Sequence, residues 1–475
     1  MIEKRQFYID GAWVDPATGN DFTVIDPSTE DSCAVISLGD QADTDAAVAA
    51  ARAAFDGWAT SPVADRIALL EKLAAIYQDR SDEMGEAISL EMGAPIDYAK
   101  ANQVGAGSWH MGGFLKALQD FKWERDFTAT EKHLLEPIGV CGLITPWNWP
   151  MNQVVLKVVP ALAAGCTVVL KPSEVAPLSS LLFAEFVHEA GFPKGVFNLV
   201  NGDGPGVGSQ LSVHKDVDMI SFTGSTRAGI AISKAAADTL KRVSLELGGK
   251  GANIIFADAD KDAVKRGARH CFANSGQSCN APTRMLVERS RYDEAVEIAA
   301  EVANATRVGP ASESGRFIGP VVSEVQFNKI QGLIEVGMKE ARLVAGGPGR
   351  PEGLNRGYYV RPTVFADVSN DMTIAQEEVF GPVLSILPFD SEEEAIAIAN
   401  DTPYGLADYV QTTDDDKRRR VARRLRAGMI ETNGSGFAQG SPFGGYKQSG
   451  NGREGGTFGI EEFLEVKAVS GWAAE

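Results

Sequence analysis

The chain contains few cysteines, and its sequence has no feature typical of a secreted, disulfide-stabilised protein. The 475 residues include five cysteines, namely Cys33, Cys141, Cys166, Cys271 and Cys279. An odd number spread so thinly is not typical of a disulfide framework. The beginning, "MIEKRQFYIDGAW", lacks the apolar core of an export signal. We therefore expect a cytoplasmic protein, in which a cysteine is either a small buried residue or a reactive thiol.

Basic charge is in deficit, which argues against nucleic acid as a partner. The chain has 45 Lys and Arg against 64 Asp and Glu, a formal net charge of −19, and no cluster of basic and aromatic residues offsets it locally. A membrane span is also missing. The best candidate, the uncharged residues 139–156, contains Pro146, Pro150 and Asn148, which hydrocarbon does not accommodate. We expect a globular protein of about two to three domains without a membrane or metal site.

The apolar periodicity predicts an α/β protein. Residues 62–77 have apolar side chains at three- and four-residue steps, which is typical of an amphipathic helix. From residue 139 onward, strand-like runs alternate with helix-like segments; the runs lie at 168–170, 196–200 and 217–222, and one helix at 178–190. This alternation predicts a parallel sheet covered on both faces. Residues 253–430 repeat it, so we expect two α/β domains that meet near Gly248 and Gly249.

Three strand-to-helix turns carry residues suited to an anionic ligand. They are "NGDGPGVG" with Gly204 and Gly208, "SFTGSTRAG" with Gly224 and Ser225, and "VVLKPSE" with Lys171 and Glu174. Glycines let a backbone approach a dinucleotide, and a helix N-terminus attracts negative charge. Each turn alone is equally well explained as an ordinary connection. Three on successive strands favour a nucleotide site.

Three further residues have both a structural and a catalytic interpretation. Glu246, at the end of the strand-like "RVSLE", is either a solvated edge carboxylate or a general base. Asn148, in "PWNWP", is either a turn residue or an amide donor aimed at developing negative charge. Cys279, in "GQSCN", is either a buried spacer or a nucleophilic thiolate that its polar neighbours could solvate.

Seven motifs together resemble the NAD(P)-dependent aldehyde dehydrogenase superfamily. They lie in the family's order between residues 146 and 454 and read "PWNWP", "KPSE", "FTGST", "LELGGK", "GQSC", "EEVFGPV" and "PFGGYKQSGNGRE". The resemblance implies a Rossmann-like cofactor domain, an α/β catalytic domain and a small β oligomerisation element. The implied boundaries are 1–118 and 138–247 for the first, 248–447 for the second, and 119–137 and 460–475 for the third.

The resemblance also assigns catalytic roles. It makes Cys279 the nucleophile that forms a thiohemiacetal and then a thioester. The Asn148 amide and the Cys279 backbone N–H become the oxyanion hole. Glu246 becomes the base that activates water for hydrolysis, and Lys157 is a candidate proton relay.

Cofactor and substrate residues follow in the same way. The cofactor implied is NAD, with NADP as a possibility, because a carboxylate at Glu174 repels a 2′-phosphate whereas Lys171 attracts it. The cofactor-binding residues implied are Thr145, Pro146, Trp147, Lys171, Pro172, Ser173, Glu174, Gly204, Gly208, Phe222, Gly224, Ser225, Gly229, Leu247, Glu378 and Phe380. The substrate tunnel implied is lined by Trp149, Asn152, Gln153, Leu156 and Phe437.

The expected partners are a small-molecule aldehyde and further copies of the chain. The resemblance implies that the strands near 121–135 and the tail 463–472 project and pair between subunits of a homodimer or homotetramer. Rival functions remain open. A CoA-acylating semialdehyde dehydrogenase usually lacks the base that Glu246 supplies, and a catalytically silent relative would have lost Cys279 or Glu246. A cysteine hydrolase would need His270 beside Cys279, whereas we interpret His270 as a helix-face residue.

Overall fold

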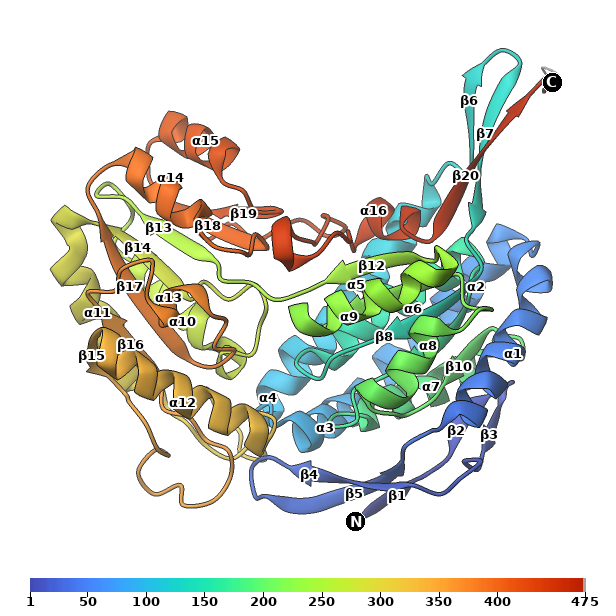
Figure 1. Ribbon diagram of the computed structural model, residues 1–475, viewed down its shortest axis with the longest axis horizontal. Coiled ribbons are helices and arrows are strands. Elements are labelled where there is room, and N and C mark those ends of the chain that lie inside the picture. The colour runs from blue at the N-terminus through green and yellow to red at the C-terminus, as the bar shows by residue number, and fades with distance from the viewer. Residues whose placement is uncertain (473–475) are drawn as a thin grey trace.

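The computed structural model describes residues 1–472 and builds them around two seven-stranded and two three-stranded β-sheets. The two large sheets form separate lobes, at the right and the left of Figure 1. The chain crosses from the first lobe to the second between Glu246 and Ala252. None of the helices among these described residues is long and apolar enough to cross a membrane.

The first large sheet has the strand order β12-β11-β8-β9-β10-β2-β3. Its strands are β12 (Arg242–Glu246), β11 (Met219–Thr223), β8 (Val140–Ile144), β9 (Thr167–Lys171), β10 (Phe197–Leu199), β2 (Phe7–Ile9) and β3 (Ala12–Val14). The first five are parallel, and β2 and β3 add an antiparallel edge. The expected strands at 168–170, 196–200 and 217–222 are β9, β10 and β11.

Successive side chains of a strand point to opposite faces of the sheet, so this sheet has a separate hydrophobic core on each face. Val168 and Leu170 pack with one group of helices, and Val169 between them packs with another. The first group is α2 (Val63–Asp79), α3 (Ser81–Met92), α5 (Val104–Gln119), α6 (Pro150–Ala164) and α7 (Leu178–Ala190). The second is α1 (Gln41–Ala59), α8 (Ser209–Val213) and α9 (Thr226–Ala236). The helices expected at 62–77 and 178–190 are α2 and α7.

The second large sheet repeats this arrangement with the order β15-β16-β17-β14-β13-β18-β19. Its strands are β15 (Arg342–Ala345), β16 (Thr363–Ala366), β17 (Val383–Phe389), β14 (Arg284–Glu288), β13 (Ala252–Ile255), β18 (Ala407–Gln411) and β19 (Met429–Thr432), all parallel except β15. One face carries α10 (Ala263–Phe272) and α11 (Tyr292–Ala305). The other carries α12 (Glu324–Glu340), α13 (Thr373–Gln376), α14 (Glu392–Asn400) and α15 (Asp415–Arg424).

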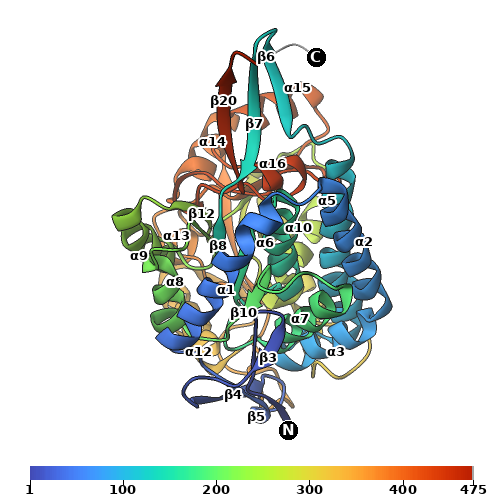
Figure 2. The same cartoon turned by 90° about the vertical axis from the view of Figure 1, so that its right-hand side faces the viewer.

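The two small sheets lie at opposite ends of the molecule (Figures 1 and 2). One consists of β1 (Ile2–Lys4), β5 (Asp31–Ser37) and β4 (Asp21–Asp26). The other is antiparallel and consists of β20 (Leu464–Ser470), β7 (Glu131–Pro137) and β6 (Glu124–Thr128). The antiparallel sheet projects from the first lobe, and within it the expected tail, as β20, pairs with β7.

Candidate functional site

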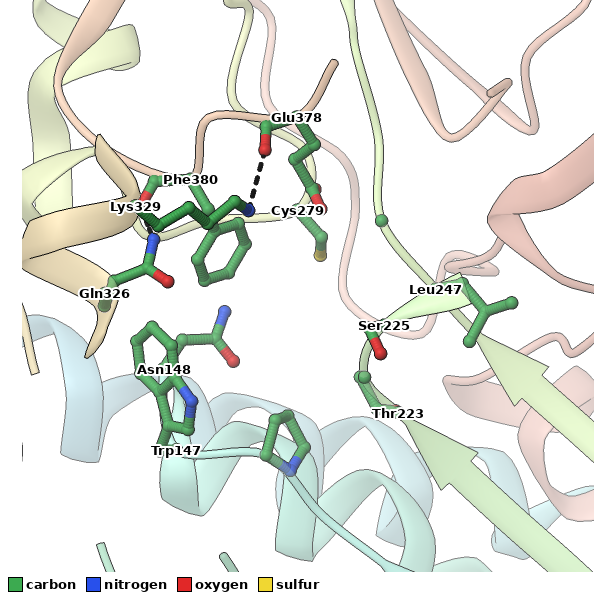
Figure 3. Close-up of a pocket in the computed structure, with 13 residues that line it drawn as sticks. Trp147, Asn148, Thr223, Ser225, Leu247, Cys279, Gln326, Lys329, Glu378 and Phe380 are labelled. Atoms are coloured by element: carbon green, nitrogen blue, oxygen red, sulfur yellow. Dashed lines mark hydrogen bonds between the residues drawn. The ribbon is translucent and has the colours of Figure 1, made fainter. Parts of the chain in front are cut away.

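A cavity of about 230 Å³ opens where the two lobes meet (Figure 3). Residues after β8, β11 and β12 of the first sheet line one side. Residues around Cys279, on α12 and before β17 of the second lobe line the other. The lining residues are Pro146, Trp147, Asn148, Thr223, Gly224, Ser225, Leu247, Gly248, Cys279, Gln326, Lys329, Glu378 and Phe380. The carboxyl ends of parallel strands are the usual ligand edge of an open α/β sheet, so the position suits a nucleotide.

The polar end of α9 faces this cavity. Ser225 is the N-cap of α9, and its hydroxyl accepts a hydrogen bond from the Ala228 backbone N–H at 3.3 Å. The first N–H groups of a helix and its dipole together favour an anion. Gly224, just before the cap, has no room for a side chain, because a Cβ there would lie 2.4 Å from the Phe222 ring. The glycine therefore lets the turn close tightly over that ring.

A second cavity, of about 240 Å³, also reaches Cys279, and its other lining residues differ from those of the first cavity. It is lined by Ala106, Trp109, His110, Trp149, Asn152, Gln153, Cys279, Asn280, Met429, Phe437, Ser441, Pro442 and Phe443. Of the five residues expected in the substrate tunnel, four line it. Leu156 does not, because it points into the core of the first lobe and is 1% exposed. Cys279 is the residue that the two cavities share.

Two glycines allow the cysteine loop to approach the strand end that faces it. A Cβ at Gly249 would lie 2.3 Å from the Cys279 carbonyl oxygen, and one at Gly248 would lie 2.4 Å from the Glu378 carboxylate. At Gly249 the clash is with backbone, so only glycine fits, whereas a side chain at Gly248 would displace the Glu378 carboxylate. These glycines belong to "LELGGK", so the motif has a steric reason in this fold.

The surroundings of the Cys279 thiol disfavour its ionised form. Burial raises its pKa, and the nearby carboxylates of Glu378 and Glu246 raise it further. The polar neighbours in the sequence do not offset these effects in the protein alone. Cys279 is nevertheless only partly buried and lines both cavities, so a ligand can reach it.

Asn148 is held opposite Cys279 by a set of amide contacts. Its side-chain nitrogen donates to the Gln277 carbonyl at 3.0 Å. Its own backbone carbonyl accepts from the side-chain amides of Gln103 at 3.1 Å and Asn274 at 3.0 Å. Figure 3 shows the Asn148 and Cys279 side chains pointing into the same cavity from its two sides. Within the described residues, the Cys279 backbone N–H donates to no other group.

Glu246 is buried, so it is not a solvated edge carboxylate. It is 3% exposed, and neither carboxylate oxygen has a hydrogen-bond partner in the part of the chain that the structure describes. Burial and the charge of Glu454 raise its pKa well above the ordinary value. The carboxylate lies against two glycines, since a Cβ at Gly444 or Gly452 would be 2.8 or 2.9 Å from Oε1. It lines neither cavity in this conformation.

A buried ion pair adjoins Glu246. The Lys157 ammonium, 1% exposed, contacts the Glu454 carboxylate, which is 4% exposed. The positive charge of Lys157 lowers the pKa of Glu246, and the negative charge of Glu454 raises it. Lys157 was a sequence candidate. Glu454 was not, although it ends the motif "PFGGYKQSGNGRE".

Glu378 and two aromatic rings close the first cavity on the side of the second lobe. The Glu378 carboxylate accepts from the Gly249 N–H at 2.9 Å, and its backbone carbonyl accepts from the Lys329 ammonium at 2.9 Å (Figure 3). Burial raises the pKa of Glu378. The rings of Trp147 and Phe380 stand edge to face with centroids 5.4 Å apart. Gln326 and Lys329 were missed because helix α12 carries no recognisable site motif.

The remaining residues expected to bind the cofactor line neither cavity; they are Thr145, Lys171, Pro172, Ser173, Glu174, Gly204, Gly208, Phe222 and Gly229. Several follow the same edge of the first sheet away from Cys279. Lys171 ends β9, its ammonium lies 3.4 Å from the Glu174 carboxylate, and burial lowers its pKa. Gly204 and Gly208 follow β10, the next strand. Lys171, Gly204 and Gly208 therefore lie along the same edge of the sheet, beyond the first cavity.

His270 is not placed to act with Cys279. It lies on α10, packs edge to face on Tyr409 at 5.2 Å, and lines neither cavity. Burial lowers its pKa. Its position is that of a helix-face residue, and no cysteine–histidine pair is formed here.

Comparison with known proteins gives matches over almost the whole chain. A family model described as "Aldehyde dehydrogenase family" matches residues 13–469. A Pseudomonas protein named 3-succinoylsemialdehyde-pyridine dehydrogenase is 52% identical over 475 residues, covering 99% of each chain.

Solved structures match equally well. An aldehyde dehydrogenase from Bartonella henselae has a TM-score of 0.99 and 59% identity, over 99% of this chain and 100% of that one. A mutant of aldehyde dehydrogenase C from Pseudomonas syringae, crystallised with NAD+ and octanal, has a TM-score of 0.97 and 49% identity, over 99% and 97%.

Proposed function

Because the chain belongs to the aldehyde dehydrogenase family, we propose that it oxidises an aldehyde to the carboxylic acid through a covalent intermediate on Cys279. The observation that supports this most is the position of the sulfur. Cys279 lines both cavities, so a substrate entering by the second would meet the thiol beside a cofactor held in the first. Substrate and cofactor would therefore both lie within reach of the Cys279 sulfur.

The residues of the first cavity fit a nicotinamide dinucleotide. The end of α9 with Ser225 suits a pyrophosphate. Glu378, Trp147 and Phe380 would hold the nicotinamide riboside near Cys279. Lys171 and Glu174, farther along the sheet edge, would hold the adenosine ribose. The Glu174 carboxylate accepts hydrogen bonds from ribose hydroxyls and repels a 2′-phosphate, so NAD is the preferred cofactor.

The first chemical step is the attack of the sulfur on the aldehyde carbon. The C=O π bond breaks as the C–S bond forms, and the electron pair moves to the oxygen. The Asn148 amide and the free backbone N–H of Cys279 would stabilise that oxyanion. The protein alone raises the pKa of the thiol, and the positive charge that NAD+ brings to the cavity favours the thiolate. Bound NAD+ supplies the hydride acceptor.

Hydrolysis then frees the thiol. Loss of hydride leaves an acyl group on Cys279, and a water molecule must attack its carbonyl carbon. We assign Glu246 as the base that takes the proton from this water, because burial gives its carboxylate a raised pKa suited to that task. Its side chain has to turn from Gly444 and Gly452 toward Cys279 for this step. Lys157 and Glu454 lie where they could carry the proton onward.

Domain roles and assembly complete the proposal. We assign residues 1–118 and 138–247 to cofactor binding and 248–447 to catalysis. Residues 119–137 and 460–475 would pair subunits of a homodimer or homotetramer. Exposed apolar side chains on the projecting sheet support the last assignment, since Phe127 is 65% and Val466 66% exposed.

Absorbance of the reduced nicotinamide, followed with an aldehyde and NAD+ in the presence and absence of CoA, tests this function. We expect one carboxylic acid per reduced cofactor without CoA. A strict need for CoA, with an acyl-CoA as product, would show the CoA-acylating alternative instead. Turnover by a Cys279→Ala variant would contradict the covalent mechanism.

A further inference from the structure

The wall of the second cavity contains a buried amide that the protein does not use. Gln153 lies on the first turn of α6 and is 3% exposed. Its Oε1 atom is buried and has no hydrogen-bond partner among residues 1–472. A buried polar group without a partner costs free energy, so an amide kept here is suited to a ligand that completes its hydrogen bonds.

The other polar side chains of this wall are either engaged or only partly buried, as Asn152, Asn280 and Ser441 are. The indole N–H of Trp149 donates to the Ser278 hydroxyl at 2.8 Å. Asn152 lies beside His110 and raises the pKa of its imidazole, but by less than burial lowers it. Gln153 is therefore the buried side chain of the wall that is free to bind a substrate group.

The charges of the cavity exclude an anionic substrate. Among the described residues that line it there is no Lys or Arg. His110 is its single titratable nitrogen base, and burial lowers the pKa of the imidazole to about 4, so it is neutral near pH 7. A substrate carboxylate would lose its water here without gaining a counter-charge.

Aromatic rings supply the apolar part of the wall. Trp109, Trp149, Phe437 and Phe443 all line the cavity, and the bond to Ser278 fixes the Trp149 ring. Such a wall suits a flat or bulky substrate body. The cavity therefore combines aromatic rings that can pack against the body of a substrate, one buried amide without a hydrogen-bond partner, and no positively charged side chain.

We propose that this enzyme selects uncharged aldehydes whose body carries a hydrogen-bond donor such as an amide N–H, and that Gln153 is the specificity-determining residue whose Oε1 accepts from this group. The proposal rests on the proposed function, because it concerns the aldehyde that Cys279 attacks. A site built to hydrogen-bond its substrate discriminates against an analogue that lacks the group, since its own buried amide then stays unpaired.

Four benzaldehydes of nearly equal size test the proposal. They carry carboxamide, acetyl, isopropyl or carboxylate as the substituent, each in the meta and the para position. We expect kcat/KM for the better carboxamide isomer to exceed that of its isopropyl counterpart by about fivefold to tenfold, the worth of one net hydrogen bond. The carboxylate should be the poorest. A carboxamide advantage below about threefold, or a carboxylate equal to the carboxamide, overturns the proposal.

Variants assign the effect to Gln153. Gln153→Met keeps the length of the side chain and removes its hydrogen bonds. It should bring the ratio of carboxamide to isopropyl kcat/KM close to one, mainly through a higher KM for the carboxamide, with kcat for the isopropyl compound retained. Gln78→Leu, an exposed glutamine on α2, is the matched control and should keep the wild-type ratio. An unchanged ratio in Gln153→Met overturns the role of Gln153.

Different results would contradict the proposed function and the specificity proposal. If the wild-type protein oxidises neither the eight compounds nor simple aliphatic aldehydes with NAD+, the proposed function fails, whereas turnover of aliphatic aldehydes alone overturns only the specificity proposal. If it oxidises them all without preference, only the specificity proposal fails. Should Gln153→Met not fold, Gln153→Leu and the wild-type series still decide the matter.

Discussion

The side-chain amide of Asn148 donates to the carbonyl oxygen of Gln277, two residues before Cys279, at 3.0 Å. This bond links the turn after β8 in the first lobe to the nucleophile loop of the second. The neighbouring bond from Trp149 to Ser278 repeats the link. The donor proposed for the oxyanion is therefore fixed to the loop that carries the proposed nucleophile.

Replacing Asn148 should affect catalysis far more than cofactor binding. Asn148→Ala removes one oxyanion donor, and we expect kcat to fall by about 10²–10³-fold. Quenching of tryptophan fluorescence by NADH measures binding, and its Kd should change less than threefold. Equal losses in NADH affinity and kcat would indicate that Asn148 only holds the two lobes together.

The raised pKa of the Cys279 thiol predicts how the free enzyme reacts with an alkylating agent. Only the thiolate reacts, so its fraction should grow about tenfold per pH unit while the pH stays below the pKa. We expect inactivation by iodoacetamide to accelerate steadily between about pH 6 and pH 9 without a plateau. Saturating NAD+ should increase the rate near pH 7. A plateau near neutral pH in the free enzyme would contradict the environment described for the sulfur.

The family, the α/β fold and the enzyme class could be predicted from the sequence, and the comparisons confirm all three. The seven motifs are short and contiguous, so each can be recognised without knowing what it contacts. Helix α7 was predicted to the residue because its apolar side chains and Gly191 are a local pattern. The resemblance placed 119–137 and 460–475 in one element, but the register in which 464–470 pair with 131–137 could not be predicted, since the two segments are far apart in the sequence.

Side-chain environments were the part that the sequence could not give. Leu156 and Gln153 are three positions apart on α6, yet one packs in the core and the other lines the second cavity. His110 faces that cavity from α5, with no motif around it. The state of the Cys279 thiol depends on Glu378 and Glu246, which only the fold brings near. Burial and charge from distant segments decide these properties.

The charge on Glu454 predicts a shift in the pH dependence of hydrolysis. Glu246 works as a base only when ionised, so the hydrolytic step should speed up as the pH rises through its raised pKa. Glu454 is one cause of that raised value. Glu454→Gln removes the negative charge and leaves Lys157 unpaired, and both changes lower the pKa of Glu246. We expect the acidic limb of the slow phase after the NADH burst to move to lower pH.

The control for this shift is Glu461→Gln, at the end of α16 (Gly456–Glu461). Its carboxylate contacts Arg125 on the projecting sheet and is absent from the causes of the Glu246 shift. The limb should stay in place in this variant. A shift to higher pH in Glu454→Gln would mean that Glu454 does not destabilise the ionised form of Glu246.

The approach of Cys279 to Gly249 predicts a strong effect of one methyl group. In Gly249→Ala the new Cβ would lie 2.3 Å from the Cys279 carbonyl oxygen, so the nucleophile loop must move. We expect a loss of about 1–3 kcal/mol of unfolding free energy and a large loss of kcat. Gly105→Ala, within α5, meets nothing within 4 Å and should be neutral or slightly stabilising in chemical denaturation. An active Gly249→Ala enzyme would show that the loop position is not critical.

The projecting sheet should determine the assembly state. Val466 on β20 is 66% exposed and Leu240, after α9, is 92% exposed, so both are available for contact. An aspartate buried in a subunit interface has no counter-charge, and Val466→Asp should therefore shift the protein to monomers in light scattering. Leu240→Asp should leave the oligomer intact. Deleting residues 466–475 removes most of the strand that pairs with β7 and should give unstable monomers. An intact, active oligomer after that deletion would contradict the proposed role of this sheet.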